Sequence, residues 1–161
     1  MTTVYIPRTL LVGEKSFTEE QLLREGTVFV VLAEPGAGKT ELLKTLADIL
    51  QTVPVRASIF RNRTQESASG PLVIDAMDEV ARIDKLATDQ IVVQARQTKA
   101  ATVIFAGRSS EWDQGRTAYV EQCFGVKLIV ARLQPFNEDE QRQLFATSLA
   151  QPCWSKLSIS S

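Results

Sequence analysis

Lys39 and Thr40 follow a glycine-containing turn, and this combination of residue types is suited to binding phosphate. Glycine can adopt backbone angles that turn successive N–H groups inward and let the main chain approach phosphate oxygens closely. Lys39 would then bridge the terminal phosphates as a positive charge, and the Thr40 hydroxyl would bind Mg2+. The predicted nucleotide-binding residues are Glu34, Pro35, Gly36, Ala37, Gly38, Lys39, Thr40 and Glu41.

The segments on either side of the turn favour this interpretation. The β-branched, apolar run Thr27–Ala33 predicts one buried strand. After the turn, apolar side chains recur with helical spacing, so that Leu42, Leu46 and Ile49 share one helix face. A strand, a glycine turn, Lys-Thr and a helix, in this order, form the context that a phosphate-binding P-loop requires.

One position departs from the full P-loop pattern. The pattern begins with glycine, whereas this chain has Ala33 at that position. Because alanine is also small, we interpret Ala33 as a tolerated variant. The alternative is a helix that is entered through a Gly-Lys turn and binds no phosphate.

Three acidic residues follow the next apolar run, which covers 72–74. Asp75 directly follows this predicted strand, where its carboxylate can hold Mg2+ opposite Thr40. Asp78 and Glu79 come a few residues later and could orient or deprotonate an attacking water. The alternative is that these acids decorate the N-terminus of a helix and stabilise its dipole.

Arg108 follows a fourth predicted strand, Thr102–Ala106. A guanidinium at this place could contact the γ-phosphate and so report its presence. It could equally be a solvated loop residue, or pair structurally with Asp75 or Asp78. The predicted catalytic residues are Asp78, Glu79, Lys39 and Arg108, and the predicted metal ligands are Thr40 and Asp75.

The fold class predicted from these alternating elements is α/β, a three-layer arrangement around a five-stranded parallel sheet. The second and fifth strands are predicted at Val53–Phe60 and Val126–Leu133. Ligands of such sheets bind at the carboxyl ends of the strands, which is where the P-loop, the acidic segment and Arg108 fall. Helices are predicted after Thr18, over 83–99, over 118–124 and after Asn137.

Three parts of the chain are distinguished by pattern. Residues 1–26 are predicted to be an extended N-terminal lead-in and a short helix, introduced by the capping box Thr18-Glu19-Glu20-Gln21. Residues 27–150 form the predicted P-loop NTPase core. Residues 151–161 show no periodicity and are predicted to be a disordered tail.

Composition limits the possible functions. The chain has 161 residues, of which 44% are hydrophobic and 23% charged, as in an ordinary globular domain. The absence of histidine excludes a histidine-based triad and argues against a zinc site. A net charge of −1 gives no reason to expect direct nucleic-acid binding. Without a signal-peptide pattern or a transmembrane-length apolar run, we expect a cytoplasmic protein with no membrane association.

With these segments in view, the chain resembles the NACHT-type NTPases, a branch of the STAND class of AAA+-related P-loop switches. In that family a small residue follows the strand Asp, as Ala76 does here, and a further acid follows, as Asp78 does. The matching segments are AEPGAGKTELL (Ala33 to Leu43), LVIDAMDEV (Leu72 to Val80), VIFAGRSSEW (Val103 to Trp112) and LQPFNEDE (Leu133 to Glu140).

The resemblance implies a core sheet in the order 5-1-4-3-2, with Asp78 as the water-activating acid and Arg108 as the sensor. It implies a slow ATPase with Mg2+ as cofactor and ATP or ADP as ligand, acting as the core of a signalling or defence switch. Family members usually carry helical, effector and sensor domains as well, so this chain corresponds to the isolated NTPase core. Self-association, or such domains of a larger protein, are therefore the expected partners besides ATP.

Two other functions remain open. The core could be a nucleotide-binding scaffold with little or no hydrolysis. It could also be a small-molecule phosphotransferase, which would need an arginine-bearing lid, and only the segment with Arg61 and Arg63 offers one. No Asn-Lys-x-Asp segment that would read guanine is present, so ATP is the expected nucleotide.

Overall fold

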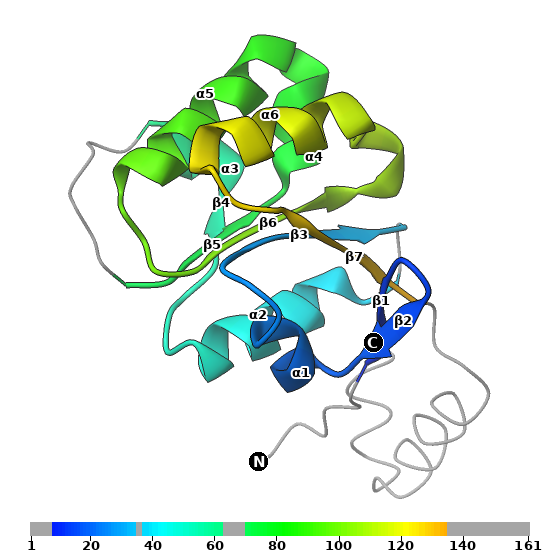
Figure 1. Cartoon of the computed structure of the whole chain (residues 1–161). Coiled ribbons are helices and arrows are strands. Elements are labelled where there is room, and N and C mark those ends of the chain that lie inside the picture. The colour runs from blue at the N-terminus through cyan, green and yellow to red at the C-terminus, as the bar shows by residue number, and fades with distance from the viewer. Residues whose placement is uncertain (1–7, 35–36, 63–69, 135–161) are drawn as a thin grey trace, which may run out of the picture.

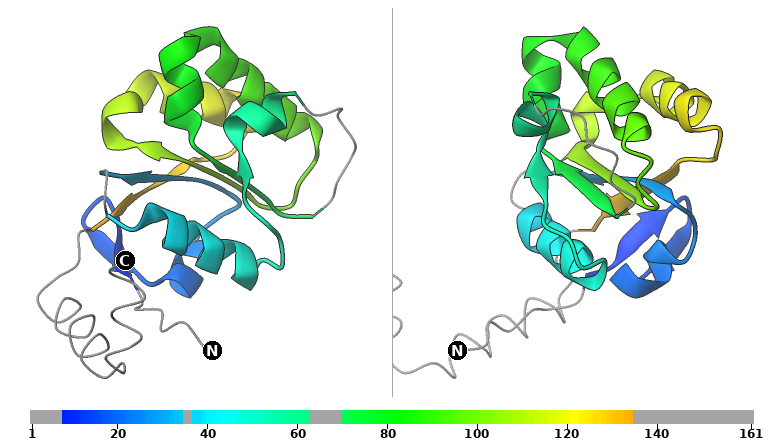
Figure 2. Two further views of the ribbon diagram at one scale, coloured as in Figure 1. Left: turned by 180° about the vertical axis from the view of Figure 1, so that it is seen from behind. Right: turned by 90° about the vertical axis from the view of Figure 1, so that its left-hand side faces the viewer.

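A seven-stranded mixed β-sheet separates two layers of helices in the computed structural model of the chain, which describes residues 8–34, 37–62 and 70–134 (Figure 1). Helices α1 and α2 cover one face of the sheet, and α3 to α6 cover the other (Figures 1 and 2). The helices are α1 (Glu19–Leu23), α2 (Lys39–Ile49), α3 (Ala57–Arg61), α4 (Met77–Ile83), α5 (Lys85–Gln97) and α6 (Gln114–Phe124), with a short 3-10 turn at Ser109–Glu111.

The strands lie in the order β2-β1-β7-β3-β6-β5-β4. From β7 to β4 all neighbouring strands are parallel, and counted along the chain from β3 these five read 5-1-4-3-2. The predicted α/β class is confirmed, but the count of five strands and the order of the whole sheet are wrong, because two antiparallel strands extend one edge. The strands are β1 (Leu10–Val12), β2 (Lys15–Phe17), β3 (Val28–Ala33), β4 (Val55–Arg56), β5 (Leu72–Asp75), β6 (Val103–Arg108) and β7 (Ile129–Leu133).

The two added strands form a hairpin in the segment predicted to be an extended lead-in. Gly13 turns the chain between β1 and β2 with a φ of 62°, a left-handed value that glycine adopts without steric cost. β1 then pairs antiparallel with β7, with Leu10 opposite Leu133. Each strand has three residues, too few for a clear alternating pattern, which is why the sequence did not predict the hairpin.

The hydrophobic core forms two layers because successive side chains of a strand point to opposite faces. Along β3, Val28, Val30 and Leu32 pack with α3 to α6, and the side chains between them pack with α1 and α2. The apolar face predicted for α2 is buried as expected at Leu42, Leu43 and Leu46. Ile49, predicted on the same face, is 41% exposed. Both faces of the parallel strands are therefore covered, as in other sheets with βαβ connections.

Two predicted elements are divided in the structure. The predicted strand Val53–Phe60 consists of the two-residue β4 and helix α3. The predicted helix over 83–99 is interrupted at Asp84, whose backbone is extended and whose side chain accepts a hydrogen bond from Leu86 N–H. Asp84 thus caps α5 and separates it from α4.

Other predictions of local structure hold. The capping box at Thr18 is present at the start of α1, with both reciprocal hydrogen bonds to Gln21. The helix predicted over 118–124 ends at Gly125 as expected, but it begins four residues earlier, at Gln114, because Asp113 caps it. The predicted helix after Asn137 and the tail lie outside the described residues. Among the described helices, none combines the length and the apolar character needed to cross a membrane.

Candidate phosphate-binding site

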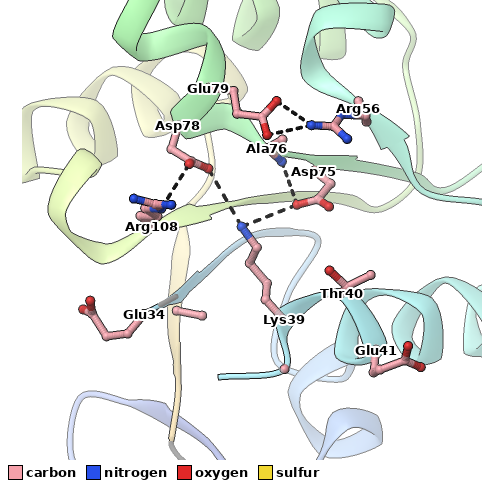
Figure 3. Close-up of a pocket in the computed structure, with 12 residues that line it drawn as sticks. Glu34, Lys39, Thr40, Glu41, Arg56, Asp75, Ala76, Asp78, Glu79 and Arg108 are labelled. Atoms are coloured by element: carbon pink, nitrogen blue, oxygen red, sulfur yellow. Dashed lines mark hydrogen bonds and ion pairs between the residues drawn. The ribbon is translucent and has the colours of Figure 1, made fainter. Parts of the chain in front are cut away.

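A cavity of about 570 Å3 opens at the carboxyl ends of the parallel strands (Figure 3). It lies between the start of α2, the ends of β4, β5 and β6, and the first turn of α4. The register places Ala33 beside Arg108 and Asp75 beside Arg56, so four strands deliver their last residues to one place. The residues that line the cavity are Ala33, Glu34, Gly38, Lys39, Thr40, Glu41, Arg56, Asp75, Ala76, Asp78, Glu79 and Arg108.

Lys39 is the first residue of α2 and extends toward the acidic segment (Figure 3). Gly38 precedes it with a φ of 89°, the left-handed conformation expected of a glycine at this turn. Lys39 Nζ lies 3.6 Å from Asp75 Oδ1 and 3.8 Å from Asp78 Oδ1. The P-loop and the acidic segment, predicted to meet, therefore form ion pairs across the cavity.

Asp78 has more cationic neighbours than the other described acids of the site. Its side chain is 6% exposed, and its Oδ2 lies 3.5 Å from Arg108 Nε and 3.7 Å from Arg82 Nη2. Together with Lys39, three cations surround this carboxylate, which offsets the cost of burying its charge. Asp78 Oδ1 accepts no hydrogen bond from the described residues. The pairing of Arg108 with Asp78 is one of the three roles that the sequence left open for this arginine, besides a γ-phosphate contact and a solvated loop position.

Arg82 was not predicted as a site residue. It follows Asp78 by four positions on α4, so the two side chains share one helix face. Arg82 Nε also lies 3.6 Å from Glu111 Oε1, in the turn after β6. The i, i+4 spacing of Asp78 and Arg82 is visible in the sequence, but it predicts a contact only if both residues lie on one helix. The structure shows that they do, because α4 begins at Met77.

Glu79 is placed differently from Asp78, although both were predicted as catalytic acids. Arg56 Nη2 donates hydrogen bonds to both carboxylate oxygens of Glu79, at 2.6 Å and 2.5 Å. The hydrogen bond with Glu79 raises the pKa of Arg56 above its usual value. Glu79 is thus held at the rim by Arg56, the last residue of β4.

The turn between β5 and α4 brings Asp75 and Asp78 to the same cavity. Ala76 adopts the left-handed conformation, with φ 62° and ψ 38°, and its N–H donates to Asp75 Oδ1 at 2.6 Å. This sharp change of direction lets α4 begin immediately after the strand, so that its first turn faces Lys39. A left-handed alanine costs about 1 kcal/mol relative to glycine.

Replacing Ala76 by glycine should therefore stabilise the protein. We expect the free energy of unfolding to rise by about 0.5 kcal/mol, because the relieved strain exceeds the added entropy of the unfolded chain. Chemical denaturation followed by circular dichroism measures the free energy of unfolding of both proteins. Ala118→Gly, at an exposed position inside α6, is the control and should destabilise by about 1 kcal/mol. A loss of stability in both variants would contradict the strain at Ala76.

The remaining predicted nucleotide-binding residues are only partly at the cavity. Glu34 and Glu41 line it, but their carboxylates point away from the cluster around Lys39 (Figure 3). Ala37 packs against the core layer beside α1 and α2. Pro35 and Gly36 lie outside the described residues.

The predicted metal ligands, Thr40 and Asp75, both line the cavity. Within the described ranges no group of three or more acidic, histidine or cysteine ligands exists that could hold a metal by itself. This donor set fits Mg2+, which is usually held by one or two carboxylates together with substrate phosphates and water.

Comparison with known proteins gives information on the fold alone. The sequence matches no protein-family model and no curated protein. One of the solved structures that resemble this chain comes from work on the structural basis of katanin self-assembly, with a TM-score of 0.50 and 19% sequence identity. The match covers 80% of this chain and 48% of the katanin chain, so the chain spans about half the length of that structure. The likeness supports the α/β fold.

Proposed function

We propose that this chain is the Mg2+-dependent, ATP-binding and ATP-hydrolysing core of a NACHT- or STAND-like signalling or defence switch. The observation that carries the proposal is the convergence of Lys39, Asp75 and Asp78 on one cavity at the carboxyl ends of parallel strands. A lysine at a helix start, facing two carboxylates across a cavity, has the charges that a Mg2+-nucleotide complex requires.

The ion pairs of Lys39 suggest how a nucleotide would change the site. A triphosphate would compete with Asp75 and Asp78 for the lysine, because charge-assisted bonds to phosphate are strong. Thr40 and Asp75 would hold Mg2+, which would neutralise charge on the phosphate oxygens. Once Lys39 contacts phosphate, Asp78 Oδ1 would face the cavity and could accept a proton from an attacking water. Arg108 would leave Asp78 to contact the γ-phosphate.

A nucleotide-binding scaffold with little or no hydrolysis is the second candidate, and one observation favours it. Both acids that could activate water are engaged by cations: Asp78 by Lys39, Arg82 and Arg108, and Glu79 by Arg56. A water would have to displace such a contact before either carboxylate could act as a base. The choice between switch and scaffold thus depends on turnover, whereas both require nucleotide binding. The part in signalling or defence rests on the sequence resemblance.

Titration of a fluorescent ATP analogue into the protein tests the proposal. We expect saturable binding in the micromolar range with Mg2+, weaker binding with EDTA, and displacement by unlabelled ATP and ADP. Phosphate release measured under the same conditions then separates the switch from the scaffold. Absence of binding by a protein shown to be folded by circular dichroism would reject both candidates.

A further inference from the structure

Arg8 is a buried arginine that does not line the cavity yet contacts the phosphate-binding turn. Its side chain is 3% exposed, and its backbone N–H donates to Glu19 Oε1 at 2.7 Å. The next residue, Thr9, accepts a hydrogen bond from Gln134 N–H at 3.3 Å. The backbone around Arg8 is therefore fixed to α1 and to the residue after β7.

The guanidinium of Arg8 holds two main-chain carbonyls that are distant in sequence. Nη1 donates to Ala37 O, and Nη2 donates to Gln134 O. Removing a guanidinium from water is costly unless its N–H groups find acceptors, so these bonds fix the side chain in one place. The Ala37 carbonyl is thereby held on the side of Arg8.

The direction of this carbonyl determines the direction of the next amide. The described residues contain no cis peptide bond, and in a planar trans peptide the carbonyl and the N–H point in opposite directions. The N–H of Gly38 must therefore point away from Arg8. Gly38 lines the cavity, whereas Arg8 does not, and a backbone N–H that points into a cavity is a donor suited to an anion.

The other side of the same residue is also fixed. Ala37 N–H donates to Glu34 O at 3.2 Å, inside the turn. Rotation of the Ala37–Gly38 peptide would turn the carbonyl toward the cavity, where it would repel phosphate oxygens. Arg8 is placed to prevent this rotation.

From these contacts we infer that Arg8 is a positioning residue of the phosphate-binding turn, which acts through the Ala37 carbonyl to present the Gly38 N–H to a phosphate group. The inference deepens the proposed function and rests on it. Through the shared guanidinium, the geometry of the turn is also tied to the last described residue after β7, Gln134.

Arg8→Met tests the inference, because methionine fills similar space but donates no hydrogen bond. We expect the Kd for the Mg2+-ATP analogue to rise about tenfold, as for the loss of a hydrogen bond from a charged group. The affinity for inorganic tripolyphosphate, measured by competition, should fall by the same factor, because the substitution affects only the contact with phosphate. Arg24→Met, at an exposed arginine after α1, is the matched control and should bind both like the wild type.

Arg8→Lys is the second variant, and it keeps the buried charge should Arg8→Met fail to fold. A lysine cannot present the two-pronged donor geometry of arginine, so its affinity for tripolyphosphate should fall as well. A folded Arg8→Met, or in its place a folded Arg8→Lys, that binds tripolyphosphate as tightly as the wild type would overturn the inference while leaving the proposed function intact. If the wild type itself bound neither ligand, both would be overturned.

Discussion

Replacing Lys39 by alanine is expected to abolish measurable nucleotide binding, with a rise in Kd of about 100-fold or more. The side chain of Lys39 extends from the start of α2 across the cavity and faces Asp75 and Asp78 (Figure 3). Without it, a triphosphate entering the cavity would meet two carboxylates whose charge is less well balanced, so attraction is lost and repulsion is gained.

The protein should remain folded in this variant. Asp78 keeps its contacts with Arg82 and Arg108, so its buried charge does not become unpaired. Titration of the fluorescent ATP analogue measures the effect, and thermal unfolding without ligand checks the fold. Lys44→Ala is the matched control, because Lys44 lies on the same helix but is exposed and pairs only with Glu41 among the described residues. If Lys39→Ala bound the ATP analogue with the wild-type affinity, the proposed role of Lys39 in phosphate binding would be contradicted.

Replacing Asp78 by asparagine is expected to leave ATP binding largely intact while slowing hydrolysis by about 100-fold or more. Asparagine has nearly the same shape but cannot accept a proton from water. Arg82 and Arg108 are both more than one-third exposed and can turn toward solvent, so the loss of their partner should cost little stability. Single-turnover phosphate release, with binding measured in parallel, tests this separation of binding from turnover.

Glu79→Gln provides the comparison for Asp78→Asn. Glu79 is about half exposed and engaged by Arg56 at the rim, so its replacement should reduce hydrolysis much less. The reverse ranking would assign Glu79, and not Asp78, as the water-activating acid. Equal and undetectable turnover in the wild type and both variants, with ATP bound by all three, would favour the scaffold.

The convergence of the site was predictable from the sequence because parallel strands present their carboxyl ends at one edge of a sheet. Strand patterns located Asp75 and Arg108, and the glycine turn located Lys39. Asp78 followed from the family resemblance and from its short distance along the chain to Asp75. None of these steps required knowledge of side-chain conformations.

The partners of these residues were not predictable in the same way. Arg56 meets Glu79 only because β4 ends after two residues and lies beside β5. Arg8 meets Gln134 over a separation of 126 residues, through a hairpin too short to leave a sequence pattern. The left-handed conformation of Ala76 was not predictable either, because alanine seldom adopts it and an alanine in a sequence does not indicate it.

The N-terminal hairpin has a consequence for solubility. Without it, β7 would be the last strand on its side of the sheet and would offer unpaired N–H and C=O groups to strands of other molecules. With it, the outermost strand on this side of the described sheet is β2, which has three residues and carries the exposed Lys15. A short strand with a lysine is a poor template for pairing with another chain. A chain shortened to begin at Thr18 would therefore tend to associate edge to edge and precipitate.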